Sequence, residues 1–70
     1  MGQQTATVIR TRRGRSKPYS GTLGELVAYF AYNLAGERPT TFSGLVDALN
    51  RQAGELRRGS YEPDRYRLRR

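Results

Sequence analysis

Arginine is the residue type whose number and placement most suggest chemistry in this chain. Twelve of its thirteen cationic residues are arginines. Each guanidinium can bind a phosphate or a carboxylate through two parallel hydrogen bonds. Residues 1–20 carry four Arg, one Lys and no acid, and residues 51–70 carry seven Arg against three acids, whereas residues 21–50 have a net charge of −2. Both ends therefore favour an acidic partner, either nucleic acid or an acidic protein surface.

Nine cations would form one phosphate-binding surface if the two ends of the chain lay side by side. Most of these contacts would position a nucleic acid without reading its sequence. The candidates are Arg10, Arg12, Arg13, Arg15, Lys17, Arg65, Arg67, Arg69 and Arg70. An equally weighted alternative is that these charges lie on exposed strands and prevent aggregation between sheet edges.

Tyrosines supply a second kind of candidate contact. Tyr19, Tyr61 and Tyr66 are close in sequence to the basic segments and could stack on unpaired bases. Tyr29 and Tyr32 point away from the apolar stripe of their expected helix. They either contact a protein partner, since tyrosine is enriched at interfaces, or are covered by the terminal strands or by residues 13–20. We favour the covered arrangement.

Catalytic and metal-binding chemistry find little support in the sequence. The chain contains neither cysteine nor histidine, and its six acidic residues are scattered. No Gly-x-Ser-x-Gly turn and no glycine-rich phosphate loop is present. A nucleophile with its base, an acid/base pair or a structural zinc site cannot be assembled from this set. We therefore expect a protein without enzymatic activity, cofactor or metal.

The N-terminal region is expected to place its cations on one strand and one loop. Residues 1–4 are polar and expected to be loose. Residues 5–12 are rich in β-branched side chains and contain no turn former, which predicts a strand. Residues 13–20 combine Gly, Ser and Pro without periodicity, which predicts a flexible basic loop.

Two helices are predicted in the middle of the chain. Thr22 and Glu25 have the spacing of a capping box, and apolar residues then recur at helical spacing, which predicts a helix over residues 22–35 with Gly36 as its left-handed cap. Thr41 precedes a similar stripe, which predicts a second helix over residues 41–57.

Strict alternation of Arg with Tyr66 and Leu68 predicts a half-buried strand over residues 65–69. The expected fold class is α+β, a single domain over residues 5–70 of order β-α-α-β. An αα-hairpin would pack on a two-stranded, antiparallel ribbon made by the terminal strands. A helix-turn-helix is a weaker alternative, in which the second helix would expose Ser43, Asp47, Asn50 and Arg51.

The functional hypothesis is a small basic accessory protein that binds nucleic acid through its Arg-rich strands and residues 13–20. The alternative is a protein-binding inhibitor or adaptor that uses Tyr29 and Tyr32, or places its arginines on an acidic protein surface. No apolar run reaches the roughly 20 residues that span a bilayer, so we expect a cytoplasmic protein without a membrane partner. A homodimer would enlarge the thin core of so short a chain. Size and composition, rather than any motif, suggest a phage or mobile-element origin.

Overall fold

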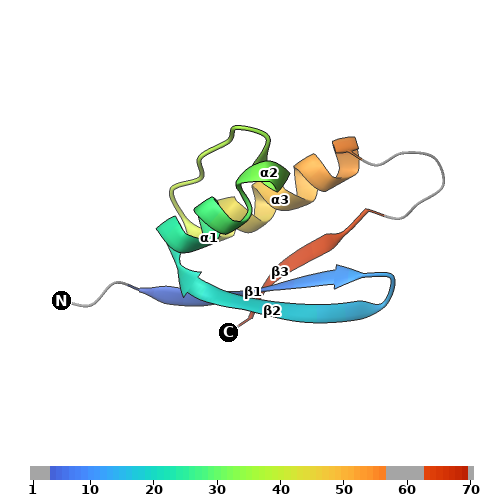
Figure 1. Ribbon diagram of the computed structural model, residues 1–70, viewed down its shortest axis with the longest axis horizontal. Helices are drawn as coiled ribbons and strands as arrows, with labels where there is room; N and C mark the ends of the chain where they lie inside the picture. The colour runs from blue at the N-terminus through green and yellow to red at the C-terminus, as the bar shows by residue number, and fades with distance from the viewer. Residues whose placement is uncertain (1–3, 57–62, 70) are drawn as a thin grey trace.

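A computed structural model describes residues 4–56 and 63–69 of the chain. The elements follow the order β1 (Thr5–Arg12), β2 (Arg15–Thr22), α1 (Leu23–Tyr29), α2 (Ala31–Leu34), α3 (Phe42–Leu56) and β3 (Arg65–Arg69). The strands form one antiparallel sheet of order β2-β1-β3, and the helices lie together on one of its faces (Figure 1). The α+β class and the antiparallel pairing of the two terminal strands are therefore confirmed.

Residues 15–22 form a strand, so the prediction of a flexible loop at 13–20 was wrong. Arg13 and Gly14 make a two-residue turn in which both φ angles are positive, 51° and 79°. Positive φ at both turn residues matches the right-handed twist of the flanking strands and closes a tight β-hairpin. The ribbon predicted from two strands is thus a three-stranded sheet with β1 at its centre.

A sequence of Ser, Pro and Gly is tolerated in β2 because this strand lies at the edge of the sheet. A proline cannot donate to the hydrogen-bond ladder, and Pro18 at an edge strand has no second neighbour to lose. Side-chain hydroxyls add cross-strand hydrogen bonds, at 2.7 Å between Thr7 and Ser20 and 2.9 Å between Thr11 and Ser16.

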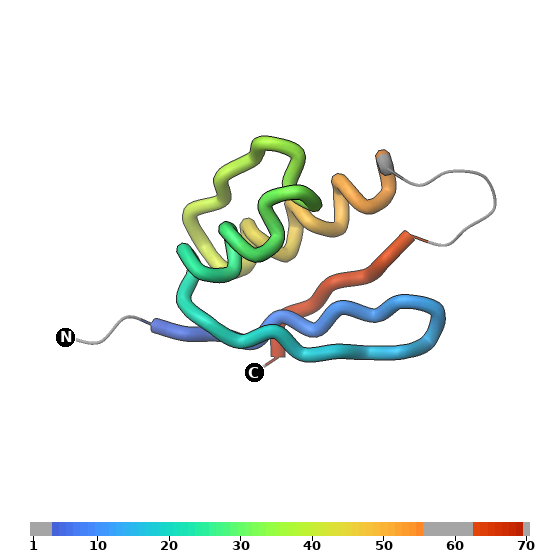
Figure 2. Tube along the Cα trace, in the orientation of Figure 1, coloured from blue at the N-terminus to red at the C-terminus, as the bar shows by residue number. Residues whose placement is uncertain are grey.

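The first predicted helix is interrupted at one residue, Phe30, which separates α1 from α2. Its predicted start is confirmed in detail, since the Thr22 hydroxyl accepts from the Glu25 amide and the Glu25 carboxylate accepts from the Thr22 amide. At the other end Ala35 and Gly36 both adopt positive φ. The 35–41 connection then runs back along the molecule, so that α3 follows the same general direction as α1 and not that of an antiparallel αα-hairpin (Figures 1 and 2).

The core lies between the helices and one face of the sheet. Val8 of β1 and Tyr66 of β3 meet the apolar stripes predicted for both helices. The buried stripe residues are Leu26, Phe30, Leu34, Leu45, Val46, Ala48 and Leu49. Phe30 is fully buried, and its ring makes edge contacts with Tyr19 of β2, Tyr29 of α1 and Tyr66 of β3, at centroid distances of 5.0–5.7 Å.

Helix α3 is tied to the outer edge of β3 by Asn50. The Asn50 amide donates to the Tyr66 carbonyl and accepts from the Tyr66 N–H, each at 2.8 Å, which is what a further strand would do there. Arg51 and Gln52 bind the Glu37 carboxylate. Asn50 and Arg51, two of the four residues that a helix-turn-helix would expose, are thus engaged within the protein.

Two glycine substitutions test this backbone. Gly14→Ala should lower the free energy of unfolding by about 1 kcal/mol, because an alanine at positive φ is strained. Gly24→Ala should raise it by roughly 0.5 kcal/mol, since an added Cβ in α1 meets no atom within 4 Å and alanine favours a helix. Urea denaturation followed by circular dichroism measures both, and a stabilising Gly14→Ala would contradict the turn geometry.

Candidate functional site

The register of the sheet divides the predicted basic surface between two faces. Residues directly opposite each other on neighbouring strands share a face. Arg10 lies opposite Lys17 and Tyr66, and Arg12 lies opposite Arg15, so these cations are on the face that carries the helices. Arg65, Arg67 and Arg69 lie opposite Thr11, Ile9 and Thr7, on the other face. The terminal strands do pair, but their arginines do not converge on one surface.

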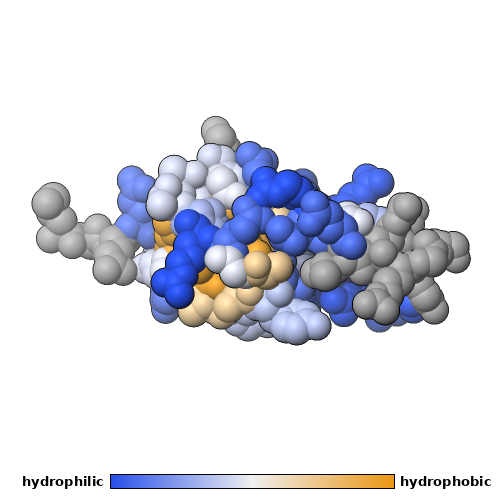
Figure 3. Space-filling view, turned by 90° about the horizontal axis from the view of Figure 1, so that it is seen from above, coloured by the Kyte–Doolittle hydropathy of each residue, from blue (hydrophilic) through white to orange (hydrophobic). Residues whose placement is uncertain are grey.

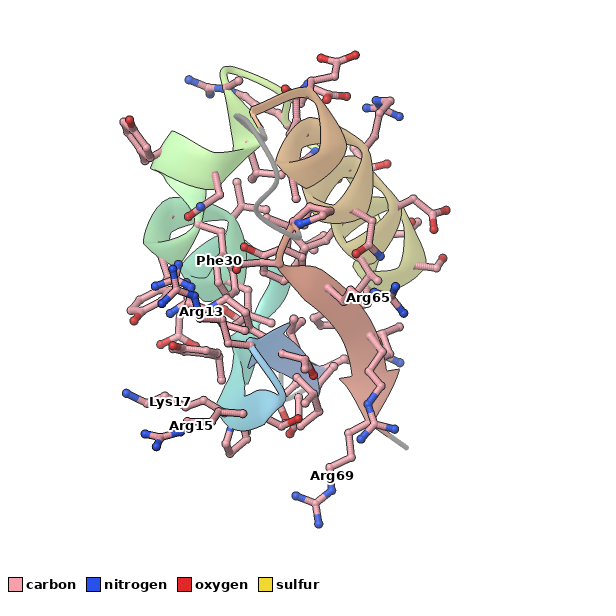
Figure 4. All side chains as sticks on the ribbon, turned by 90° about the vertical axis from the view of Figure 1, so that its right-hand side faces the viewer. Arg13, Arg15, Lys17, Phe30, Arg65 and Arg69 are labelled. Carbon is pink, nitrogen blue, oxygen red and sulfur yellow. The ribbon has the colours of Figure 1, made fainter. Side chains whose placement is uncertain are left out.

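We call the first group the basic hairpin face; it comprises Arg10, Arg12, Arg15 and Lys17 of β1 and β2, with Arg13 at the turn. Figure 4 shows Arg13, Arg15 and Lys17 projecting from the same side of the molecule, away from Arg65 and Arg69. Two cross-strand pairs, Arg10 with Lys17 and Arg12 with Arg15, bring like charges opposite each other. Such pairs destabilise a sheet unless anions or neighbouring groups compensate them.

Tyr19 organises one end of the basic hairpin face. Its hydroxyl accepts a hydrogen bond of 2.7 Å from Nη2 of Arg10, and its ring centroid lies 5.1 Å from the Arg10 guanidinium carbon. Lys17 Nζ is 5.7 Å from the same centroid. Both cations are within the range of cation–π attraction. Tyr19 thus fixes Arg10 and partly offsets the repulsion between Arg10 and Lys17.

Tyr29 of α1 lies next to Tyr19 and is largely exposed. Its ring lies 5.0 Å from that of Tyr19, at an interplanar angle of 40°, and 61% of the residue is exposed. The pKa of Tyr29 is raised, first by hydrogen bonding with Tyr19. We expected Tyr29 and Tyr32 to be covered, and this was wrong: Tyr29 stays largely exposed despite its contact with Tyr19, and Tyr32 is 89% exposed.

The other tyrosines differ in availability. Tyr66 is 5% exposed within the core, so stacking on a base, as its position in sequence suggested, is excluded in this fold. Tyr61 and Arg70 lie outside the described residues.

Asp64 is a residue of this face that the sequence analysis did not single out. Its carboxylate accepts from Nε and Nη2 of Arg12 at 2.9–3.2 Å, and this pairing raises the pKa of Arg12. The antiparallel pairing of the terminal strands could have predicted this ion pair, because a register that puts Thr11 opposite Arg65 also brings position 64 to Arg12. Asp64 thus places one negative charge against Arg12 of the basic hairpin face.

The opposite face of the sheet is rich in hydroxyl groups, and no described helix covers it (Figure 1). It carries Thr and Ser side chains of β1 and β2 beside Arg65, Arg67 and Arg69 of β3. Ile9 is only 7% exposed here, between Pro18 and Arg67 on the neighbouring strands. These three arginines therefore form a separate column with no like-charged residue directly opposite.

The helix side shows a shallow apolar area among hydrophilic residues (Figure 3). A groove there is lined by Val27, Ala28 and Ala31 of α1 and α2 and by residues 36–38. Within the described ranges, no three acidic side chains gather closely enough to hold a metal ion, and no helix is long and apolar enough to cross a membrane.

Comparison with known proteins adds no relative to this picture. No family model matches the chain, and neither the curated proteins nor the solved structures contain a significant match.

Tyr66 lies opposite Arg10 on the neighbouring strand and should make the fold sensitive to alkali. Burial raises the pKa of Tyr66 above that of a free tyrosine, with Arg10 acting in the opposite direction. Because the pKa of Tyr66 is raised in the folded state, protonated Tyr66 contributes to the free energy of unfolding. This contribution is complete below the unfolded pKa of about 10 and is lost as the pH rises through the folded pKa.

Urea denaturation between about pH 8 and pH 11 should therefore show a loss of stability that is smaller in Tyr66→Phe. Tyr32→Phe serves as the control, because Tyr32 is exposed. Equal alkaline losses in Tyr66→Phe and the unmodified protein would contradict a role for Tyr66.

Proposed function

We propose that this protein binds nucleic acid through the basic hairpin face, without catalysing a reaction. The observation that carries the proposal is that the register places two like-charged pairs opposite each other, Arg10 with Lys17 and Arg12 with Arg15, on the strands whose Tyr19 contacts the exposed Tyr29. Phosphate groups would relieve this repulsion and release counterions on binding. A guanidinium or ammonium group needs no ordered pocket for such contacts.

Protection of sheet edges does not account for this arrangement. Cations on edge strands commonly prevent aggregation, and Lys17 of β2 or the arginines of β3 suit that role. Arg10 and Arg12, however, belong to the central strand, whose backbone is paired on both sides. Their charge is therefore better explained by a ligand above this face than by defence of an edge.

A protein partner is the second candidate, and the exposure of Tyr32 supports it. This tyrosine is 89% exposed on α2 and makes none of the described ring contacts. An inhibitor or adaptor could use Tyr32, Tyr29 and the adjacent apolar groove, or place the arginines on an acidic protein. The cytoplasmic location, the homodimer and the phage or mobile-element origin are further predictions from composition and size.

Salt-dependent binding tests the main proposal. Fluorescence anisotropy with labelled DNA and RNA oligomers, between about 50 and 200 mM salt, should show affinity falling steeply as phosphate contacts require. Arg15→Gln with Lys17→Gln should reduce the slope of log affinity against log salt by about 1.4–1.8, since each lost phosphate contact contributes about 0.7–0.9.

The matched control is Arg65→Gln with Arg69→Gln, which removes the same charge from the opposite face and should change the slope much less. Equal changes in the two double variants would mean that binding follows net charge alone. Absence of binding at low salt would refute the proposal.

Asp64 should restrain binding at the same face. Asp64→Asn removes the carboxylate that pairs with Arg12, and should raise affinity and steepen the salt slope by up to about 0.7–0.9. Asp47→Asn makes the same change of charge on α3 and serves as the control. A gain of affinity that is equal in both variants would argue against a local role for Asp64.

A further inference from the structure

We infer that the nucleic acid bound by the basic hairpin face is single-stranded, and that the exposed ring of Tyr29 stacks on one of its unpaired bases. This inference rests on the proposed function and specifies its ligand. The inference joins Tyr29, which the sequence analysis considered as a contact for a protein partner, to the cations of the hairpin.

The geometry around Tyr29 resembles what a stacking platform requires. Its ring makes a T-shaped contact with the Phe30 ring, at 5.0 Å and 84°, and a tilted contact with the Tyr19 ring, at 5.0 Å and 40°. Phe30 is itself fully buried, so the support is fixed by the core. A ring that is already ordered loses little conformational freedom on binding. The exposed remainder of Tyr29 is available to a flat apolar ligand.

The charges near Tyr29 suit a phosphate backbone that passes across the hairpin. The Arg10 guanidinium carbon and Lys17 Nζ lie 5.1 and 5.7 Å from the centroid of the Tyr19 ring. The Tyr19 ring in turn contacts the ring of Tyr29. A chain whose phosphates contact these cations therefore runs within reach of the Tyr29 ring. A basic track beside an aromatic ring is the common design of proteins that bind single strands with little sequence preference.

Duplex DNA fits this face less well. Two-stranded ribbons that read the sequence of a duplex enter one of its grooves, and the wider major groove measures about 12 Å. Here helix α1 stands on the same face of the sheet as Arg10 and Lys17 (Figure 1), and Tyr29 at its end contacts Tyr19, which lies beside both cations. The helix layer therefore limits how deeply this part of the hairpin can enter a groove. In a duplex, moreover, the base faces are stacked on one another and are closed to Tyr29.

The test compares one sequence as single-stranded DNA, single-stranded RNA and duplex DNA at one fixed salt concentration. Single strands should bind more tightly than the duplex. Tyr29→Ala should weaken single-strand binding about tenfold, whereas Tyr29→Phe should stay within about twofold because stacking needs the ring and not the hydroxyl. Tyr32→Ala, an equal truncation of an exposed tyrosine in α2, should also stay within about twofold. Circular dichroism checks that each variant is folded.

A measurement on the unmodified protein guards against a Tyr29 variant that fails to fold. Ultraviolet cross-linking to an oligomer that contains bromouracil should attach the base to Tyr29, as located by mass spectrometry of the peptides.

The inference fails if duplex binds as well as single strands, if Tyr29→Ala and Tyr32→Ala act alike, or if cross-links avoid Tyr29. In those cases salt-dependent binding would still support the proposed function. Lack of binding to all three ligands would overturn both.

Discussion

The burial of Phe30 is the interaction on which the rest of this structure depends. Its ring, at the junction of α1 and α2, contacts aromatic rings from β2, α1 and β3, and so joins the first half of the chain to its last strand. A chain of 70 residues has a thin core, so one aromatic side chain carries a large share of the buried area. Through Tyr19, the same ring also supports two of the hairpin cations, Arg10 and Lys17. Packing and the candidate site are therefore coupled at one residue.

The alternation of side chains along β1 decides which charges lie on the same face of the sheet. Val8 must face the helices, and alternation along the strand then puts Arg10 and Arg12 on that same face, beyond the covered core. The same rule, applied to Tyr66 in β3, turns Arg65, Arg67 and Arg69 to the opposite face. Concentrating cations on the hairpin costs stability, which Tyr19 and Asp64 offset only in part. Under the proposed function, phosphate groups would offset more of this cost.

Both edges of the sheet carry devices that discourage the addition of another strand. Pro18 interrupts the donors along β2, and the Asn50 side chain occupies the backbone groups of Tyr66 on β3. Under the proposed function, recognition would therefore fall to side chains on the two faces of the sheet. This agrees with a binding mode based on phosphate and ring contacts rather than on strand addition.

The sequence by itself determined the strands at 5–12 and 65–69, the apolar stripes of both helices and the Thr22–Glu25 cap, because each depends on local periodicity or on residues three apart. It did not reveal β2, since Ser, Lys and Pro form a strand here only when the Arg13–Gly14 turn and the Phe30–Tyr19 contact place them at an edge. It identified the cations of the candidate site but not how they are divided between the two faces of the sheet. Register alone puts Arg10 beside Lys17 and away from Arg67, and register follows from which side of each strand the core buries. Tertiary packing likewise joined Tyr29 to the basic hairpin face, because that contact runs between a helix and a strand that local sequence rules do not connect.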